Sequence, residues 1–107
     1  MRASDYRLVY DKGFRVASSL FAAFCLARQD VENGIGPRIG LTVPRAVAGA
    51  VGRNRIKRRL REAFRLHRSD IGPQWDIVFN PRRPVLQAQF KEIERELESV
   101  IRKCNLR

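Results

Sequence analysis

Alternating apolar and polar residues predict four β-strands along the chain. Residues 38–43 alternate Ile, Leu and Val with Gly and Thr, and residues 75–80 alternate Trp, Ile and Phe with other residues, as half-buried strands do. Residues 14–18 and 20–27 also fit strands, the second being apolar on both faces. Between the second and third strands, Asn33-Gly34 favours a turn.

Three other segments have the three- and four-residue apolar spacing of amphipathic helices. The first would begin at Ser4, a candidate N-cap, and end at Gly13 in a left-handed conformation. The second runs from Val47 to His67. In the third, apolar residues recur from Leu86 to Cys104.

The predicted element order is αβββαβα, which indicates an α+β sandwich with helices packed on one four-stranded sheet. With 107 residues, the chain is long enough for one core but not for two. We therefore expect a single domain that spans residues 1–107.

Positive charge is concentrated in the middle helix. The chain has a net charge of +11, and residues 53–68 contain eight basic residues beside one acid, Glu62. Like charges three and four residues apart repel each other on a helix, so the arrangement favours an external polyanion. Seven of the eight are arginines, whose guanidinium binds phosphate bidentately and stacks on nucleobases.

A helical wheel separates an apolar stripe from a basic flank. The stripe consists of Ile56, Leu60, Ala63, Phe64 and His67. A ridge at i+4 intervals consists of Arg53, Lys57, Arg61 and Arg65, with Asn54 and Arg68 beside it, whereas Arg55 and Arg59 lie on the other flank. The simpler interpretation is a solvated face whose side-chain stems cover the edge of the core. A single acid among eight basic residues favours anion binding instead.

Single-stranded nucleic acid suits this chain better than a membrane or duplex DNA. A membrane-surface helix presents bulky apolar residues to lipid, but here the apolar stripe is needed to pack on the sheet. No helix-turn-helix pair or zinc-ligand spacing favours duplex DNA. The N-terminus lacks the pattern of a signal peptide, so we expect a cytoplasmic protein.

Aromatic residues near the first helix and the strands suggest a second binding surface. Tyr6 and Tyr10 share one helix face, and Ala22 and Phe24 would form a floor beneath them. Such a groove would hold an unpaired strand by stacking its bases on the rings. From the residues alone, simple core packing of these aromatics is an equally good interpretation.

No motif indicates catalysis or metal binding by the chain itself. His67, the single histidine, fits a packing or capping residue, and the acids of the last helix fit a solvated face. Cys25 and Cys104 fit buried hydrophobes better than a disulfide framework or a zinc site. A protein-only nuclease that uses His67 is therefore the least favoured alternative.

One long segment closely resembles the signature region of the bacterial ribonuclease P protein subunit. It comprises residues 38–65, RIGLTVPRAVAGAVGRNRIKRRLREAFR. The match is most specific in RNRIKR at 53–58 and REAFR at 61–65. The segments VYDKGFRVASSLFAAFCLA and PRRPVLQAQFKEIERELE also resemble the family, so the resemblance covers nearly the whole chain.

The resemblance implies that the chain works with RNA. In this family a large catalytic RNA, using bound Mg²⁺, hydrolyses the phosphodiester at the 5′ end of mature tRNA, and the protein holds the single-stranded 5′ leader. The expected partners are the ribonuclease P catalytic RNA and precursor tRNA, while Mg²⁺ belongs to the RNA and no protein partner is identifiable. The resemblance also implies an unusual left-handed strand–helix–strand crossover.

By position, the pattern and the resemblance together assign candidate RNA-binding roles to Arg45, Arg53, Asn54, Arg55, Lys57, Arg58, Arg61, Arg65 and Arg68, and a leader cleft to Tyr6, Tyr10, Ala22 and Phe24. The chain departs from the family at residues 44–46, where Ser-Lys-Lys is common, and at Ala48-Gly49, where Gly-Asn is usual. Composition alone fits a structural or chaperone-like RNA-binding protein, such as a small ribosomal component, equally well. The RNRIKR and REAFR signature favours the ribonuclease P subunit.

Overall fold

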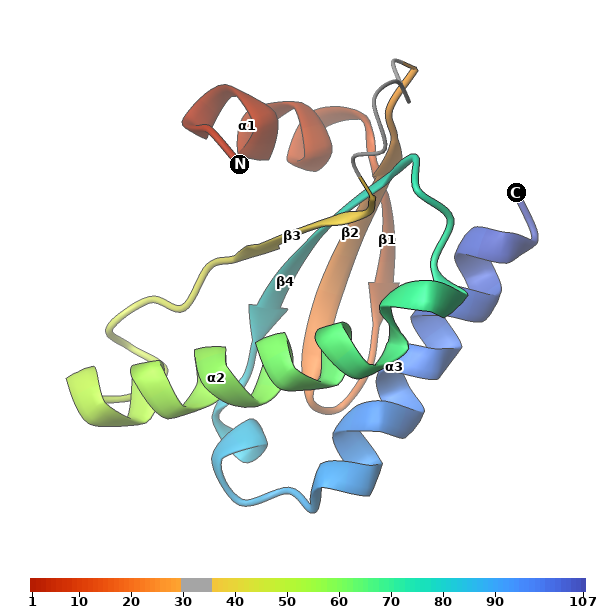
Figure 1. Cartoon of the computed structure of the whole chain (residues 1–107). Helices are drawn as coiled ribbons and strands as arrows, with labels where there is room; N and C mark the ends of the chain where they lie inside the picture. Colours follow the sequence, from red (N-terminus) through yellow and green to blue (C-terminus); the bar gives the residue numbers. More distant parts are fainter. Residues whose placement is uncertain (30–35) are drawn as a thin grey trace.

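In the computed structural model, which describes residues 1–29 and 36–107, the elements follow the order αβββαβα and confirm the predicted fold class (Figure 1). The helices and strands are α1 (Ala3–Lys12), β1 (Phe14–Ala17), β2 (Phe21–Ala27), β3 (Arg38–Leu41), α2 (Ala50–His67), β4 (Trp75–Pro81) and α3 (Phe90–Asn105), with two short 3₁₀ helices, η1 (Arg68–Asp70) and η2 (Arg83–Leu86). The expected turn at Asn33-Gly34 lies outside the described residues.

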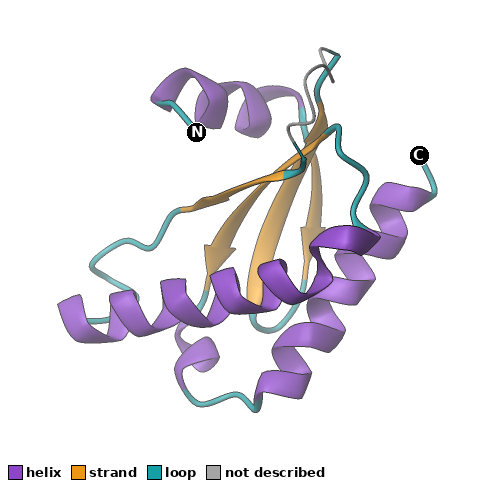
Figure 2. Ribbon diagram, in the orientation of Figure 1, coloured by secondary structure: helices purple, strands orange, loops and turns teal. Residues whose placement is uncertain are grey.

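The four strands form one mixed sheet in the order β1-β2-β4-β3. The β1–β2 and β2–β4 pairs are antiparallel, and the β3–β4 pair is parallel. Parallel neighbouring strands need a crossover connection. Here α2, which lies on one face of the sheet, connects β3 to β4 (Figure 2). The left hand of this crossover stays an expectation from the resemblance.

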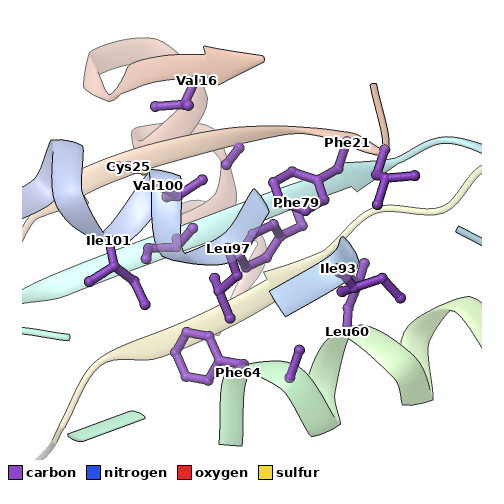
Figure 3. Packing of buried hydrophobic residues seen from close by; sticks show 14 of the residues in the cluster. Val16, Phe21, Cys25, Leu60, Phe64, Phe79, Ile93, Leu97, Val100 and Ile101 are labelled. Atoms are coloured by element: carbon purple, nitrogen blue, oxygen red, sulfur yellow. The ribbon is translucent and has the colours of Figure 1, made fainter. Parts of the chain in front are cut away.

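The two faces of the sheet have different roles. Helices α2 and α3 cover one face, where Phe21, Phe79 and Ile77 are almost completely buried. Figure 3 shows Phe64 of α2 and Leu97 of α3 entering this core from the two helices. The opposite face carries the alternate residues of each strand, and α1 packs against it through contacts with β2 and β4. Part of that face remains available to a ligand.

The ends of several elements differ from the sequence-based prediction. Helix α2 begins at Ala50 rather than Val47, because residues 45–47 form a turn that the Val47 N–H closes on the Pro44 carbonyl. Strand β3 ends at Leu41 rather than residue 43. Leu86 belongs to η2, which has Pro84 in its first turn, and α3 begins only at Phe90.

The first helix has a different N-terminal cap and a different backbone conformation at its C-terminal glycine from those predicted. Ser4 lies inside α1, and the cap is made instead by Asp5, whose carboxylate accepts a 2.8 Å hydrogen bond from the Arg2 N–H. Gly13 ends the helix as predicted, but its φ of −76° is not left-handed. Glycine is required there by space, because a Cβ would lie 2.5 Å from the Val9 carbonyl oxygen and 2.8 Å from that of Cys25.

A buried ion-pair cluster fixes the β3 edge of the sheet. Asp76 of β4 is 3% exposed and is the one buried charged residue among those the structure describes. Its carboxylate accepts hydrogen bonds from Arg28 at 2.5 Å and from Arg38 at 2.6 and 2.8 Å. The hydrogen bond to Asp76 raises the pKa of Arg38. Removing either arginine would leave part of a buried carboxylate unpaired, so both have structural roles.

Candidate nucleic-acid interface

Helix α2 has the two-sided character that its sequence predicted. Ile56, Leu60, Ala63 and Phe64 are buried in the core, and His67 is largely buried beside them. The outward face carries the basic residues. This burial pattern explains why the helix is stable despite its internal repulsion, since the apolar stripe holds it against the sheet.

The structure divides the basic residues of α2 into free and engaged groups. Asn54, Arg55, Arg58 and Arg61 are exposed, and within the described chain none of these side chains forms a hydrogen bond or ion pair; Lys57 is half-buried beside them and is likewise unpaired there. Their donors are therefore available to an external anion. Arg45, in the turn before α2, is also exposed.

Three of the candidate RNA-binding arginines have partners within the protein. Arg53 donates to the Ala48 carbonyl at 2.9 Å and holds the connector before the helix. Arg65 pairs with Glu62 through bonds of 2.5 and 3.1 Å, and its hydrogen bonds lower the pKa of that carboxyl. A Cβ added to Gly36 would lie 2.7 Å from a guanidinium nitrogen of Arg68, so that side chain packs against the chain before β3.

Arg59 bonds within the protein and connects α2 to the segment that precedes α3. Its guanidinium donates to the carbonyls of Val85 and Ala88, the second at 2.5 Å, and so ties α2 to η2 and the start of α3. Burial, together with the neighbouring charge of Arg55, lowers the pKa of Arg59. Arg58 and Arg59, which are adjacent in the sequence, thus have different roles. Arg59 is bonded inside the protein, whereas Arg58 is exposed.

A hollow of about 340 Å³ lies on the sheet face opposite α2 and α3. Ala22 and Phe24 of β2 line it together with Asn80 and Pro81 of β4. The connector from β3 to α2 forms another wall through the residues Thr42, Pro44 and Val47. The hollow therefore adjoins the segment that leads directly into the basic helix.

The two tyrosines of α1 approach this face at different places. Tyr10 contacts Phe24 edge-on, with ring centroids 4.9 Å apart, and its hydroxyl lies 2.8 Å from Thr42 Oγ1 and 2.7 Å from Asn80 Oδ1. Tyr6 instead covers Gly40, where a Cβ would lie 2.8 Å from its ring, and its hydroxyl accepts a hydrogen bond from the Leu41 N–H. Tyr10, Ala22 and Phe24 are thus brought together, whereas Tyr6 lies toward the β3 edge.

Reasoning from the sequence missed the four polar or charged residues of the hollow. Thr42 and Asn80 complete its polar side, and the guanidinium-bearing residues Arg15 and Arg82 border it. Strand register could have revealed two of them, because Arg15 pairs with Phe24 and Asn80 pairs with Ala22. Arg82 is held in place by a 2.7 Å hydrogen bond to the Ser18 carbonyl.

His67 lies away from the hollow, between α2 and α3. Its Nε2 is 2.8 Å from a carboxylate oxygen of Glu94, and its Nδ1 is 3.7 Å from Asp70. Glu96 of the same helix also makes specific contacts, since it accepts hydrogen bonds from the N–H of Leu20 and the hydroxyl of Ser19. The prediction that the acids of the last helix form a solvated face was therefore wrong for Glu94 and Glu96.

The remaining candidate groups are internal. Cys25 and Cys104 are buried free thiols, and the hydrogen bond between them, followed by burial, raises the pKa of Cys25. Among the described residues, no three His, Cys, Asp or Glu side chains are grouped as a metal site would require. In residues 1–29 and 36–107, no helix is both long and apolar enough to cross a bilayer.

Comparison with known proteins gives a consistent result. Residues 1–105 match the family model described as Ribonuclease P. The ribonuclease P protein component of Alkaliphilus metalliredigens is 37% identical over 102 residues, which cover 95% of this chain and 88% of that protein. The solved Staphylococcus aureus RNase P protein superposes with a TM-score of 0.80 at 30% identity, covering 96% of this chain and 91% of that one. The Thermotoga maritima protein, at 24% identity and a TM-score of 0.82 over 96% of this chain and 94% of that one, shows the same fold.

Proposed function

The chain belongs to the bacterial ribonuclease P protein family, whose members act as a subunit in tRNA 5′ processing, and we propose that it performs this role through two surfaces. The outward face of α2 binds the catalytic RNA. The hollow beneath Tyr10 holds the single-stranded 5′ leader of precursor tRNA.

One observation carries this proposal: the aromatic hollow and the basic helix are joined by a single short connector. Pro44 and Val47 line the hollow, and α2 begins three residues after Val47, at Ala50. A leader stacked on Phe24 would therefore lie near exposed Arg45 and close to catalytic RNA bound on α2. Stacking aromatics flanked by positive charge suit an unpaired strand.

Each surface would contribute a different kind of interaction. Arg55, Arg58 and Arg61 can neutralise phosphates, which releases counterions and makes binding dependent on salt. About six such contacts predict a slope of roughly −4 to −5 in log K against log salt. Phe24 and Tyr10 would add stacking, which is worth about 1–3 kcal/mol per base and depends little on sequence.

We assign the hydrolytic chemistry to the RNA partner. The one histidine of the chain is engaged with Glu94 between two helices, on the side of the sheet away from the hollow. The family resemblance associates Mg²⁺ with the RNA, and we assign it no ligands in this chain. Bound to the RNA, Mg²⁺ would activate the attacking water. The protein would position the leader and offset repulsion as two RNAs approach. The compartment we propose is the cytoplasm.

The decisive experiment is cleavage of a precursor tRNA by a bacterial ribonuclease P RNA at low Mg²⁺, with and without the protein. We expect strong stimulation by the protein and no cleavage by the protein alone. Tight, salt-sensitive RNA binding without stimulation would instead favour a structural RNA-binding protein. Cleavage by the protein alone would contradict the assignment of chemistry to the RNA.

A second comparison tests the leader cleft. Phe24→Ala removes the half-buried ring that lines the hollow. We expect it to weaken binding of leader-containing precursors by roughly five- to a hundredfold, the equivalent of one stacked base, while leaderless tRNA binds as before. Equal weakening for both substrates would show that the hollow does not hold the leader.

A further inference from the structure

Three polar side chains from three different elements meet at the edge of the hollow. The Tyr10 hydroxyl of α1 contacts both Thr42 Oγ1, just after β3, and Asn80 Oδ1 of β4, at 2.8 and 2.7 Å. These residues are 32 and 70 positions away from Tyr10 in the chain. Their convergence is a product of the tertiary fold and is not needed to close the core, which lies on the other face of the sheet.

In the structure, the oxygen of the Asn80 amide faces the Tyr10 hydroxyl, and this contact sets which hydroxyl of the trio donates. A phenol has one proton to donate, and an amide oxygen can only accept. Tyr10 therefore donates to Asn80 Oδ1, and the Thr42 hydroxyl, which has its own proton, donates to Tyr10. The Asn80 Nδ2 group donates no hydrogen bond within the described chain, and Asn80 lines the hollow. Two N–H donors are thus available to a bound group.

The space beside this amide suits one nucleobase. The hollow of about 340 Å³ is at the small end of the range for ligand pockets. Ala22 is paired directly with Asn80 across the strands, and its small methyl group fills less of the hollow than a larger side chain would. Phe24 lies two residues further along β2, within diagonal reach of Asn80. A base stacked on Phe24 would therefore direct one of its edges at the amide.

The charged border of the hollow would fix the backbone of such a nucleotide. Arg15 pairs with Phe24 across β1 and β2, and Arg82 follows β4 directly. Both line the hollow, and the bond from Arg82 to the Ser18 carbonyl uses only one of its guanidinium nitrogens. Phosphate contacts of this kind set position without selecting a base. Selection then depends on the group that faces the base edge.

We propose that Asn80 is a specificity-determining residue that reads the edge of one leader nucleotide and favours a keto base, uracil or guanine, over an amino base, adenine or cytosine. This inference rests on the proposed function of the hollow. The amide oxygen accepts from Tyr10, and the Nδ2 group, which has no partner within the described chain, offers its two N–H donors to the base. The O4 of uracil or the O6 of guanine accepts from those donors, whereas the exocyclic amino groups of adenine and cytosine would place donor against donor.

The test uses the assembled enzyme, with the ribonuclease P RNA and precursor tRNAs whose leader positions are changed one at a time to each of the four bases. Equilibrium binding gives the keto-to-amino preference at every position. We expect a preference of about tenfold at one position in the wild type, consistent with one base-edge contact. Asn80→Ala should abolish that preference.

Asn80→Asp provides the sharper variant. Its carboxylate has only acceptors, and Tyr10 can still donate to it, so the preference at that position should reverse toward adenine and cytosine. The added negative charge weakens binding of all four leaders alike, so the ratio between bases is the quantity to compare. Tyr10→Phe frees the amide to rotate and should reduce the preference while retaining the aromatic ring.

The outcomes separate this inference from the function on which it rests. If the leader strengthens binding but the wild type shows no base preference, or Asn80→Ala and Asn80→Asp retain the wild-type preference, the role of Asn80 is overturned and the leader cleft stands. If leaderless tRNA binds as tightly as the precursor, the proposed function of the hollow fails, and the inference fails with it. Thermal unfolding of each variant confirms that it is folded.

Discussion

Arg58 and Arg59 are neighbours in the sequence, and the structure predicts opposite consequences for their removal. Arg58 is exposed and has no partner within the described chain, whereas Arg59 donates to the Val85 and Ala88 carbonyls. Each alanine substitution lowers the net charge by one. A comparison of the two variants therefore separates a directed phosphate contact from a general effect of charge.

The magnitudes follow from the contacts that each residue makes. Removing one phosphate contact lowers the salt slope of binding by about 0.7–0.9, so Arg58→Ala combined with Arg61→Ala should lower it by roughly 1.4–1.8. Both residues point outward, so the melting temperature should change little. Arg59→Ala leaves two carbonyls without their charged donor, which costs about 1–3 kcal/mol and lowers the melting temperature by at least about 4 °C.

Two measurements test this prediction: binding of ribonuclease P RNA across a series of monovalent salt concentrations, and thermal unfolding of the free protein. The reasoning is refuted if Arg59→Ala, measured below its melting temperature, lowers the salt slope as much as Arg58→Ala, because net charge alone would then explain both. An unchanged slope in the Arg58 and Arg61 double variant would show that this face of α2 does not bind the RNA.

Three further predictions concern the scaffold. Gly13→Ala should lower stability by about 1–3 kcal/mol in chemical unfolding, because its Cβ would lie 2.5 Å from the Val9 carbonyl oxygen; an unchanged midpoint would contradict the tight approach. His67→Ala should cost about 1 kcal/mol through loss of its bond to Glu94 and leave cleavage by the assembled enzyme nearly unchanged; a large loss of cleavage with intact assembly would point to a catalytic histidine. The hydrogen bond from the Arg2 N–H lowers the pKa of Asp5 below its ordinary value of 3.8, so its stabilising contribution is complete above pH 3.8 and is lost as pH falls through the lowered pKa. Asp5→Asn should remove that part of the acid dependence, as followed by unfolding at successive pH values.

The local pattern of the sequence was enough to predict the element order and the amphipathic character of α2. Apolar periodicity reports which side of a helix or strand is buried, and this property depends on residues only a few positions apart. Ile56, Leu60 and Phe64 are buried as their spacing predicted. The boundaries were less predictable, because the end of each element depends on turn hydrogen bonds such as the one that delays α2 to Ala50.

The sequence by itself determined that this is a basic α+β domain with one arginine-rich helix, because charge and periodicity are local properties. Only the tertiary structure decided which arginines are bonded within the described chain, since Arg59 finds its acceptors 26 and 29 residues away. It likewise brought Tyr10, Thr42 and Asn80 together from three elements. Side-chain hydrogen bonds require distances of about 3 Å and defined angles, and contacts of that precision between distant residues are set by strand register and helix docking.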